Sequence, residues 1–322
     1  MTDAAIDMPK RPNRLARTLK PILLLRESWV GMLGAGLVVF WVLVAIFAPL
    51  LSPFSPNATL APLQAPFTDY IVSGMTPISG TLSMAKDLCP AVAGDPSMVD
   101  CGTFWLGTDM LGRDILSRII WGARTVLIFA PLATLCAYLV GIPMGLWAGY
   151  SRGRADAIFS FISNVILSFP VLVLYVLIIT TIDRSAANIV FAVVFASAPG
   201  IFRIVRGLAM DLRAREYVFA AETRGEPLWF ILFVEILPNA RGPLIVDAML
   251  RLGYVIITIG TLAFLGLGLP PPDPDWGRMI SEGRQMIQIA PYIALFPCLA
   301  ISSLVLGFNL MADGLREISL RD

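Results

Sequence analysis

Long apolar stretches, nearly free of charge, alternate along the chain with shorter polar segments. Each stretch has the ~20 residues that an α-helix needs to cross a bilayer. Because a backbone in lipid must satisfy its own hydrogen bonds, such stretches predict helices. The pattern predicts an all-α polytopic membrane protein with six spans. They cover residues 29–51, 125–151, 157–182, 188–210, 243–269 and 286–311.

The polar segments divide the chain into four parts. Residues 1–28 form a basic segment without the short apolar core and cleavage site of a signal peptide, so 29–52 is predicted as a first transmembrane helix. Residues 53–124 form an insert between the first two spans. Residues 125–322 form a core with the other five spans.

Basic residues are distributed unequally between the two sides of the membrane. Sixteen of the 24 lysines and arginines fall in segments predicted to share one side, seven fall on the other, and Arg251 falls within a span. Cytoplasmic loops carry the excess of Lys and Arg. Both termini are therefore predicted to be cytoplasmic, with the insert outside.

The first part of the insert is rich in Pro, Ser, Gly and Asp and is predicted to be a loop. It contains Cys89 and Cys101, on the side of the membrane where disulfides persist. The sequence leaves open a disulfide between them or two unpaired thiols. Cys136 and Cys298 fall in apolar spans, where they are expected to be small core residues.

The end of the insert, residues 107–124, predicts an amphipathic helix. Thr108 or Asp109 is placed to cap it, and apolar residues recur at helical spacing from Leu111 onward. Asp114 and Arg118 are spaced for an i,i+4 ion pair. The expectation is a helix on the membrane surface, and the alternative is a contact with a ligand.

A charged segment with a break lies between the fourth and fifth spans. Residues 214–224 predict a short helix with one apolar face. Gly225 stands where a C′ glycine ends a helix, and Pro227 suits the first turn of a second one. Such a helix-turn-helix on the cytoplasmic side is placed to meet a soluble partner.

Composition excludes several classes of function. The chain is 57% hydrophobic and 15% charged, where soluble domains carry about 25% charged residues. It has no histidine, which excludes His-based catalytic triads and HExxH zinc sites. None of its three lysines belongs to a GxxxxGK[ST] loop, so any drive from ATP must come from another subunit.

Asp247 and Arg251 are four residues apart in the fifth span. One interpretation is a charged group beside a translocation path. The other, which the position near the inner end favours, is a local ion pair with Arg251 extended toward the cytoplasm.

Three stretches together resemble the inner-membrane permeases of bacterial ABC importers, in particular the dipeptide/oligopeptide/nickel family. The charged segment is similar to the family's EAA loop, with Phe219-Ala220-Ala221, Gly225 and Leu237-Pro238 at the family's spacing. Phe219 stands where the family usually has glutamate. Residues 106–124 and 261–316 are similar to motifs of the shorter, C-type permease, and the resemblance covers about 104–316.

The resemblance implies roles for individual residues. Residues 214–227 would be a coupling helix that docks on a cytoplasmic ATPase, with Gly225 and Pro227 at its turn. Apolar contact is implied for Tyr217, Val218, Ala220 and Ala221, and charged contact for Glu216, Glu222, Arg224 and Glu226. Contact with an extracytoplasmic binding protein is a hypothesis for Asp109, Arg113 and Asp114.

The resemblance also implies an assembly in the bacterial inner membrane. A homologous second permease would complete a heterodimer, and two ATPase subunits would hold ATP and Mg. A periplasmic or lipid-anchored binding protein would deliver the solute. This chain would hold no cofactor, metal or catalytic residue and bind no nucleic acid. Peptides are the expected solute, and nickel chelates, glutathione, opines and related small solutes are the alternatives.

Two other classes of function remain for comparison. An ion-coupled secondary transporter needs carboxylates or broken helices near the midplane, and the spans have almost no such carboxylate. A membrane-embedded enzyme needs a reactive cluster, and Asp and Glu lie mostly in loops. Both are disfavoured.

Overall fold

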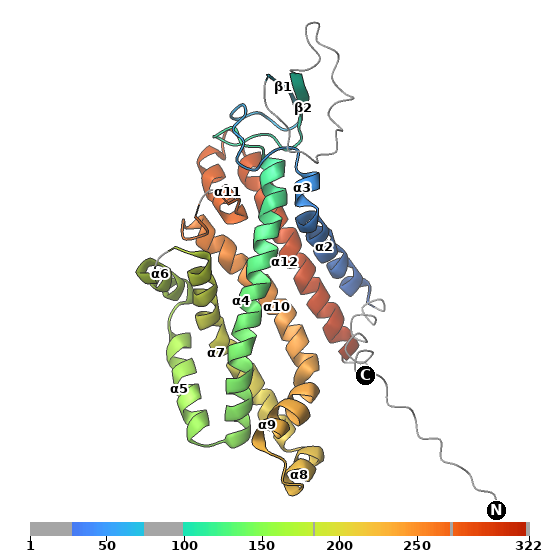
Figure 1. Ribbon diagram of the computed structural model, residues 1–322, viewed down its shortest axis with the longest axis vertical. Helices are drawn as coiled ribbons and strands as arrows, with labels where there is room; N and C mark the ends of the chain where they lie inside the picture. The colour runs from blue at the N-terminus through green and yellow to red at the C-terminus, as the bar shows by residue number, and fades with distance from the viewer. Residues whose placement is uncertain (1–27, 74–98, 183, 271–272, 320–322) are drawn as a thin grey trace, which may run out of the picture.

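The computed structural model describes residues 28–73, 99–182, 184–270 and 273–319. They form an elongated bundle of helices, with a two-stranded sheet at one end and the short helix α8 at the other (Figure 1). We call these the β end and the α8 end. Five helices are long and apolar enough to span a membrane, and a bent pair makes a sixth span if it is counted as one.

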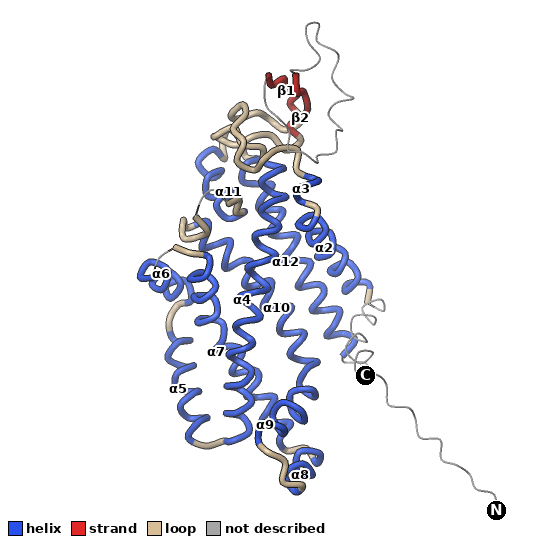
Figure 2. The backbone as a smooth tube through the Cα atoms, viewed as in Figure 1, coloured by secondary structure: helices blue, strands red, loops and turns tan. Residues whose placement is uncertain are grey.

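Figure 2 colours the helices, strands and loops by type. The helices are α2 (Trp29–Ile46), α3 (Ala48–Leu51), α4 (Ile115–Ser151), α5 (Arg154–Ser168), α6 (Val171–Ile182), α7 (Ala186–Arg213), α8 (Glu216–Thr223), α9 (Leu228–Phe230), α10 (Leu237–Phe264), α11 (Trp276–Gly283) and α12 (Tyr292–Ser319). A π-helical segment, η2 (Ile231–Ile236), joins α9 to α10, and a 3₁₀ turn, η3 (Arg284–Met286), follows α11.

The insert contains an antiparallel hairpin that the sequence did not predict. β1 (Thr68–Ser73) pairs with β2 (Val99–Phe104), and Cys101 lies opposite Ile71 in the register. Cys89 lies outside the described residues, so the disulfide with Cys101 stays a prediction.

The prediction of an amphipathic helix from residue 107 was wrong in its extent. Residues 107–114 form a tight loop in which Gly107 and Gly112 have positive φ, and a single helix runs from Ile115 through the membrane. Asp109 is held in the loop because its carboxylate accepts hydrogen bonds from the backbone N–H groups of Leu111 and Arg113. The helix therefore extends the second span instead of lying on the membrane surface.

The third span is broken. α5 and α6 are bent by 92° where Phe169 and Pro170 separate them. The break follows from proline chemistry, since Pro170 has no N–H to donate and disfavours a helical conformation in the residue before it. In Figure 1, α6 projects sideways from the bundle.

Small residues let α4 approach α7 closely. Gly141, Gly145 and Gly149 recur every four residues on one face of α4. A Cβ at Gly145 would lie 2.6 Å from Val205 Cβ, and one at Gly149 would lie 2.5 Å from the carbonyl oxygen of Arg206. Because lipid tails are as apolar as side chains, such close packing is a main source of association between membrane helices.

The segment between the fifth and sixth predicted spans contains α11, which packs on the β end of the bundle. Trp276 is fully buried there, and its indole N–H donates to the carbonyl oxygen of Ile119 at 2.9 Å. Gly122 of α4 leaves the space for this ring, because a Cβ would lie 2.6 Å from it. α11 is thus attached to the first turns of α4.

Candidate functional site

The helix α8 lies at the α8 end of the bundle, and its local sequence explains its shape. Glu216 begins it, and Gly225 ends it in the left-handed conformation, with φ of 75°. The backbone N–H of Glu226 donates to the carbonyl oxygen of Ala221 at 3.2 Å. This closes the helix as a C′ glycine does. Pro227 then directly precedes α9, so the predicted break and restart are confirmed.

The inner face of α8 packs into the hydrophobic core of the chain itself. Val218 and Ala221 are fully buried in a cluster with Val205, Ile231 and Ile236. The family resemblance implied that Val218 and Ala221 contact a partner, and this expectation needs correction because neither side chain reaches the surface. Tyr217, given the same role, is half-buried against the same cluster.

The outer face of α8 and the start of α9 expose large apolar side chains. Phe219 is 55% exposed, Trp229 is 62% exposed, and Leu228 is exposed beside them. Ala220, Glu216 and Arg224 are also exposed, and the chain turns between them at Gly225. We call Glu216, Phe219, Ala220, Arg224, Leu228 and Trp229 the α8 surface. Sequence reasoning missed Leu228 and Trp229, although two large apolar residues after a proline turn were a usable signal.

The charged residues of the segment divide into two groups. Arg224 lies 3.5 Å from Glu226 and 3.4 Å from Glu235. Such exposed pairs contribute little to stability, so Arg224 remains available to a partner. Glu222, in contrast, accepts a hydrogen bond from the Tyr150 hydroxyl at 2.7 Å, so it anchors α8 to the end of α4.

Arg213 completes this anchor. Its guanidinium lies 4.9 Å from the centre of the Tyr150 ring, and it donates a hydrogen bond to the carbonyl oxygen of Tyr150. Tyr150, Arg213 and Glu222 therefore join the ends of α4, α7 and α8, and we call them the anchor cluster. The sequence alone gave no signal for the anchor cluster, because its three residues come from separate segments.

The EAA-like pattern ends at Leu237 and Pro238, the first residues of α10. Pro238 is exposed and cannot donate a backbone hydrogen bond, and the preceding six residues adopt the wider π-helical spacing. The pattern thus marks the place where the chain returns from the α8 surface into the membrane.

The residues predicted to meet a binding protein form a charged network at the β end. Arg113 donates to Asp109 and to Glu282 of α11, both at 2.6 Å. Arg118 is fully buried 3.9 Å from each of these carboxylates. The network ties the loop before α4 to α11.

Asp114 has a structural role in this network. It caps α4, accepting from the backbone N–H of Ser117 at 2.7 Å and from its hydroxyl at 2.6 Å, so the expected pair with Arg118 does not form. Asp109 and Asp114 are both buried, and burial raises the pKa of Asp114 above its usual range. Neither carboxylate lies on the surface, so the hypothesis that they touch a binding protein directly needs correction.

The ion pair in the fifth span forms as the sequence allowed, but its surroundings differ. Arg251 Nε donates to Asp247 Oδ2 at 2.7 Å. The Tyr138 hydroxyl of α4 donates to the same carboxylate. The Nη atoms of Arg251 lie beside Gly200 of α7, so the side chain extends across the bundle and not toward the α8 end.

The part of the chain that the structure describes contains no group of three or more Cys, Asp and Glu residues placed to hold a metal ion. The chemistry at both ends is that of charge pairs and exposed apolar side chains. Such surfaces suit protein–protein contact.

Comparison with known proteins identifies two matching families. The family described as "Binding-protein-dependent transport system inner membrane component" matches residues 141–321. The "N-terminal TM domain of oligopeptide transport permease C" matches residues 24–69.

Individual proteins with similar sequences are also named as permeases of transport systems. The chain is 43% identical over 213 residues to the glutathione transport system permease protein of Pectobacterium atrosepticum, covering 66% of this chain and 71% of the relative. It is 34% identical to a dipeptide transport system permease protein of Alkalihalophilus pseudofirmus, covering 91% and 86%. It is 32% identical to one of Haemophilus influenzae, covering 93% and 95%.

Proposed function

Because the chain belongs to the family of binding-protein-dependent transport system inner membrane components, we propose that it is a permease subunit of an ATP-driven importer that carries peptides across the bacterial inner membrane. Relatives named as dipeptide and glutathione permeases support this class of solute, since both names refer to small peptides. The observation that carries the mechanism is the α8 surface.

The α8 surface is proposed to dock on a cytoplasmic ATPase subunit. Phe219, Leu228 and Trp229 are large, apolar and exposed at the end of the bundle, which is the composition of an interface centre. Aromatic side chains supply most of the binding energy in such contacts. The charges of Glu216 and Arg224 surround them and suit the rim.

The anchor cluster is proposed to transmit movement of the ATPase to the spans. A partner that shifts α8 also shifts Glu222, and with it the ends of α4 and α7 through Tyr150 and Arg213. Because α4 and α7 pack too closely to slide independently, they are expected to move as one body.

At the opposite end, the substrate-binding protein is proposed to dock on the exposed surface around the charged network. Leu111 and Trp105 are exposed there, and Glu282 is partly exposed. Arg113 and the two buried aspartates hold this surface in shape. The remaining partners are a homologous second permease in a heterodimer and two ATPase subunits, which bind ATP and Mg in place of this chain.

Transport-linked ATP hydrolysis in proteoliposomes tests the proposal. The copurified complex is assayed with and without binding protein and dipeptide. We expect Phe219→Ala combined with Trp229→Ala to reduce copurification of the ATPase and to lower uptake at least about tenfold, since each aromatic anchor contributes about 1–2 kcal/mol. Ile289→Ala is the control, because Ile289 is also large, apolar and exposed but lies far from α8, at the β end.

Two outcomes would contradict the proposal. If the double variant retains both ATPase and uptake, the α8 surface is not the docking site. If no ATPase copurifies with the wild type and uptake follows an imposed proton gradient, the chain is an ion-coupled transporter.

A further inference from the structure

The ion pair of Asp247 and Arg251 lies midway along α10, farther from the α8 end than the predicted span of 243–269 implied. α4 is free of charge from Thr125 to Ser151, and Tyr138 is the central residue of this stretch. Because the Tyr138 hydroxyl donates to Asp247, the carboxylate shares its depth. A charge at the bilayer centre is costly unless it faces a partner or a water-filled cavity.

The guanidinium of Arg251 extends past Asp247 toward α7. Asp247 engages Arg251 through Nε, while the Nη atoms lie over Gly200, where a Cβ would be 3.1 Å from Nη1. The side chains of Arg251 and Asp247 remain 19% and 17% exposed. Gly200 thus leaves space for a guanidinium that is partly accessible from outside the bundle.

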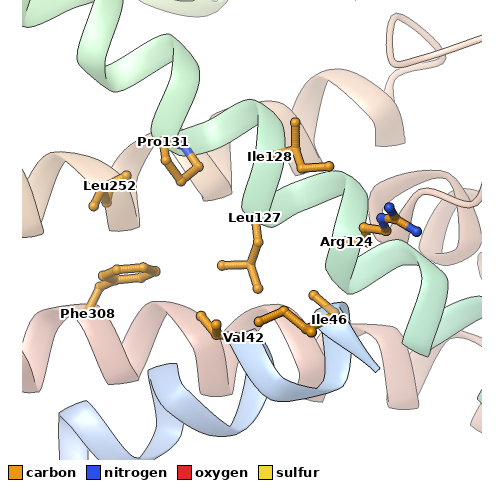
Figure 3. Close-up of a pocket in the computed structure, with 9 residues that line it drawn as sticks. Val42, Ile46, Arg124, Leu127, Ile128, Pro131, Leu252 and Phe308 are labelled. Carbon is orange, nitrogen blue, oxygen red and sulfur yellow. The ribbon is translucent and has the colours of Figure 1, made fainter. Parts of the chain in front are cut away.

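The accessible side of α10 carries further polar groups. Tyr254, less than one turn from Arg251, is 68% exposed. Leu252 points to another side of α10, into a pocket of about 530 Å³ that it lines with Val42, Ile46, Leu127, Pro131 and Phe308 (Figure 3). Apart from Arg124, the residues that line the pocket with Leu252 are apolar, while the side with Tyr254 combines a hydroxyl and an ion pair, as expected for the wall of a solute path.

We propose that Arg251 and Asp247 bind the two charged termini of the transported peptide at the middle of the membrane. Arg251 would bind the carboxylate, for which the planar guanidinium is suited, and Asp247 would bind the ammonium group. Cβ atoms four residues apart on a helix lie about 5–6 Å apart, and a dipeptide spans at most about 7 Å. The 2.7 Å contact between Arg251 and Asp247 opens when the dipeptide binds between them. The inference rests on the proposed peptide transport and specifies how this path recognises a zwitterion.

Uptake of end-blocked dipeptides tests the proposal. Proteoliposomes with the complete complex and saturating binding protein are given the free dipeptide, its C-terminal amide and its N-acetyl derivative. The readout is the ratio of uptake rates for free and blocked forms. Preferences of the binding protein cancel when this ratio is compared between permease variants.

We expect each variant to lose one preference. Arg251→Gln should reduce the preference for the free carboxylate at least about tenfold, the effect of losing one charged hydrogen bond. Arg251→Lys should retain part of it. Asp247→Asn should reduce the preference for the free amine and leave the carboxylate preference closer to wild type. If the pair is only structural, the variants will lower all uptake rates together and leave both ratios unchanged. That result would overturn the proposal.

Cysteine labelling covers the case in which these variants do not assemble. In a chain whose four native cysteines are replaced, Tyr254→Cys should react with a water-soluble thiol reagent, and dipeptide should slow the reaction. Leu252→Cys is the matched control and should not react. Absence of labelling at position 254 would overturn the proposal. If the wild type takes up no dipeptide, the proposed function fails instead.

Discussion

At the scale of single residues, the structure reassigns carboxylates that sequence analysis placed on the surface. Asp109 and Asp114 are buried and bind backbone N–H groups, and Glu222 binds Tyr150. Phe219, which replaces the glutamate usual in the family, is exposed instead. The proposed contact with an ATPase therefore depends on the apolar area of Phe219.

The burial of Asp114 predicts a dependence of stability on pH. Its pKa is raised in the folded chain from the ordinary value of 3.8 by burial, so folding favours the protonated form. The stability that this provides is fully present below about 3.8 and is lost as the pH rises through the raised pKa. We expect the Tm of Asp114→Asn to rise relative to that of wild type as the pH increases from 3.8 through the raised pKa of Asp114.

Thermal unfolding of the detergent-solubilised complex at several pH values checks this. Asn can still cap α4, so the helix start is retained. Asp273→Asn, at an exposed position, is the control. A difference in Tm between Asp114→Asn and wild type that is constant with pH would contradict the expectation.

At the scale of elements, sequence patterns predicted the spans better than the segments between them. Gly225 and Pro227 acted through local backbone chemistry, so the end of α8 was predictable. The loop at 107–114 was not, because its shape depends on Arg113 reaching Glu282, 169 residues away. The bend at Pro170 was not predicted either, because a proline alone does not decide it: Pro131 and Pro143 lie inside the continuous helix α4.

The glycine face of α4 gives an element-scale prediction. Gly145→Val should disrupt the contact with α7, because its Cβ would lie 2.6 Å from Val205 Cβ. We expect a loss of about 1–3 kcal/mol, the usual cost of overpacking. Gly207→Val on α7 is the control, since nothing lies within 4 Å of that position.

Unfolding of each purified variant in denaturing detergent measures the difference. Equal stability of Gly145→Val and Gly207→Val would show that α4 and α7 can separate without cost. The transmission of movement through both helices as one body would then be wrong.

At the scale of the whole molecule, the anchor cluster links the α8 surface to the spans. Tyr150→Phe removes the hydrogen bond to Glu222 and retains the ring under Arg213. We expect the complex to assemble and hydrolyse ATP, while the number of peptides imported per ATP falls about threefold or more. The reason is that α8 can then shift without α4.

Simultaneous measurement of uptake and phosphate release in proteoliposomes gives this ratio. Tyr292→Phe is a suitable control, because it removes a hydroxyl that donates to the carbonyl oxygen of Gln64, far from α8. An unchanged ratio in Tyr150→Phe would assign the cluster to folding alone.

The unbroken course of α4 has a thermodynamic consequence. The helix runs from Ile115 to Ser151, about 55 Å at 1.5 Å per residue, with the charged network at one end and Tyr150 at the other. Two ligands that bias the tilt of one such rod must influence each other equally. If nucleotide bound to the ATPase raises the affinity of the complex for the binding protein by some factor, the docked binding protein must raise the affinity for nucleotide by the same factor.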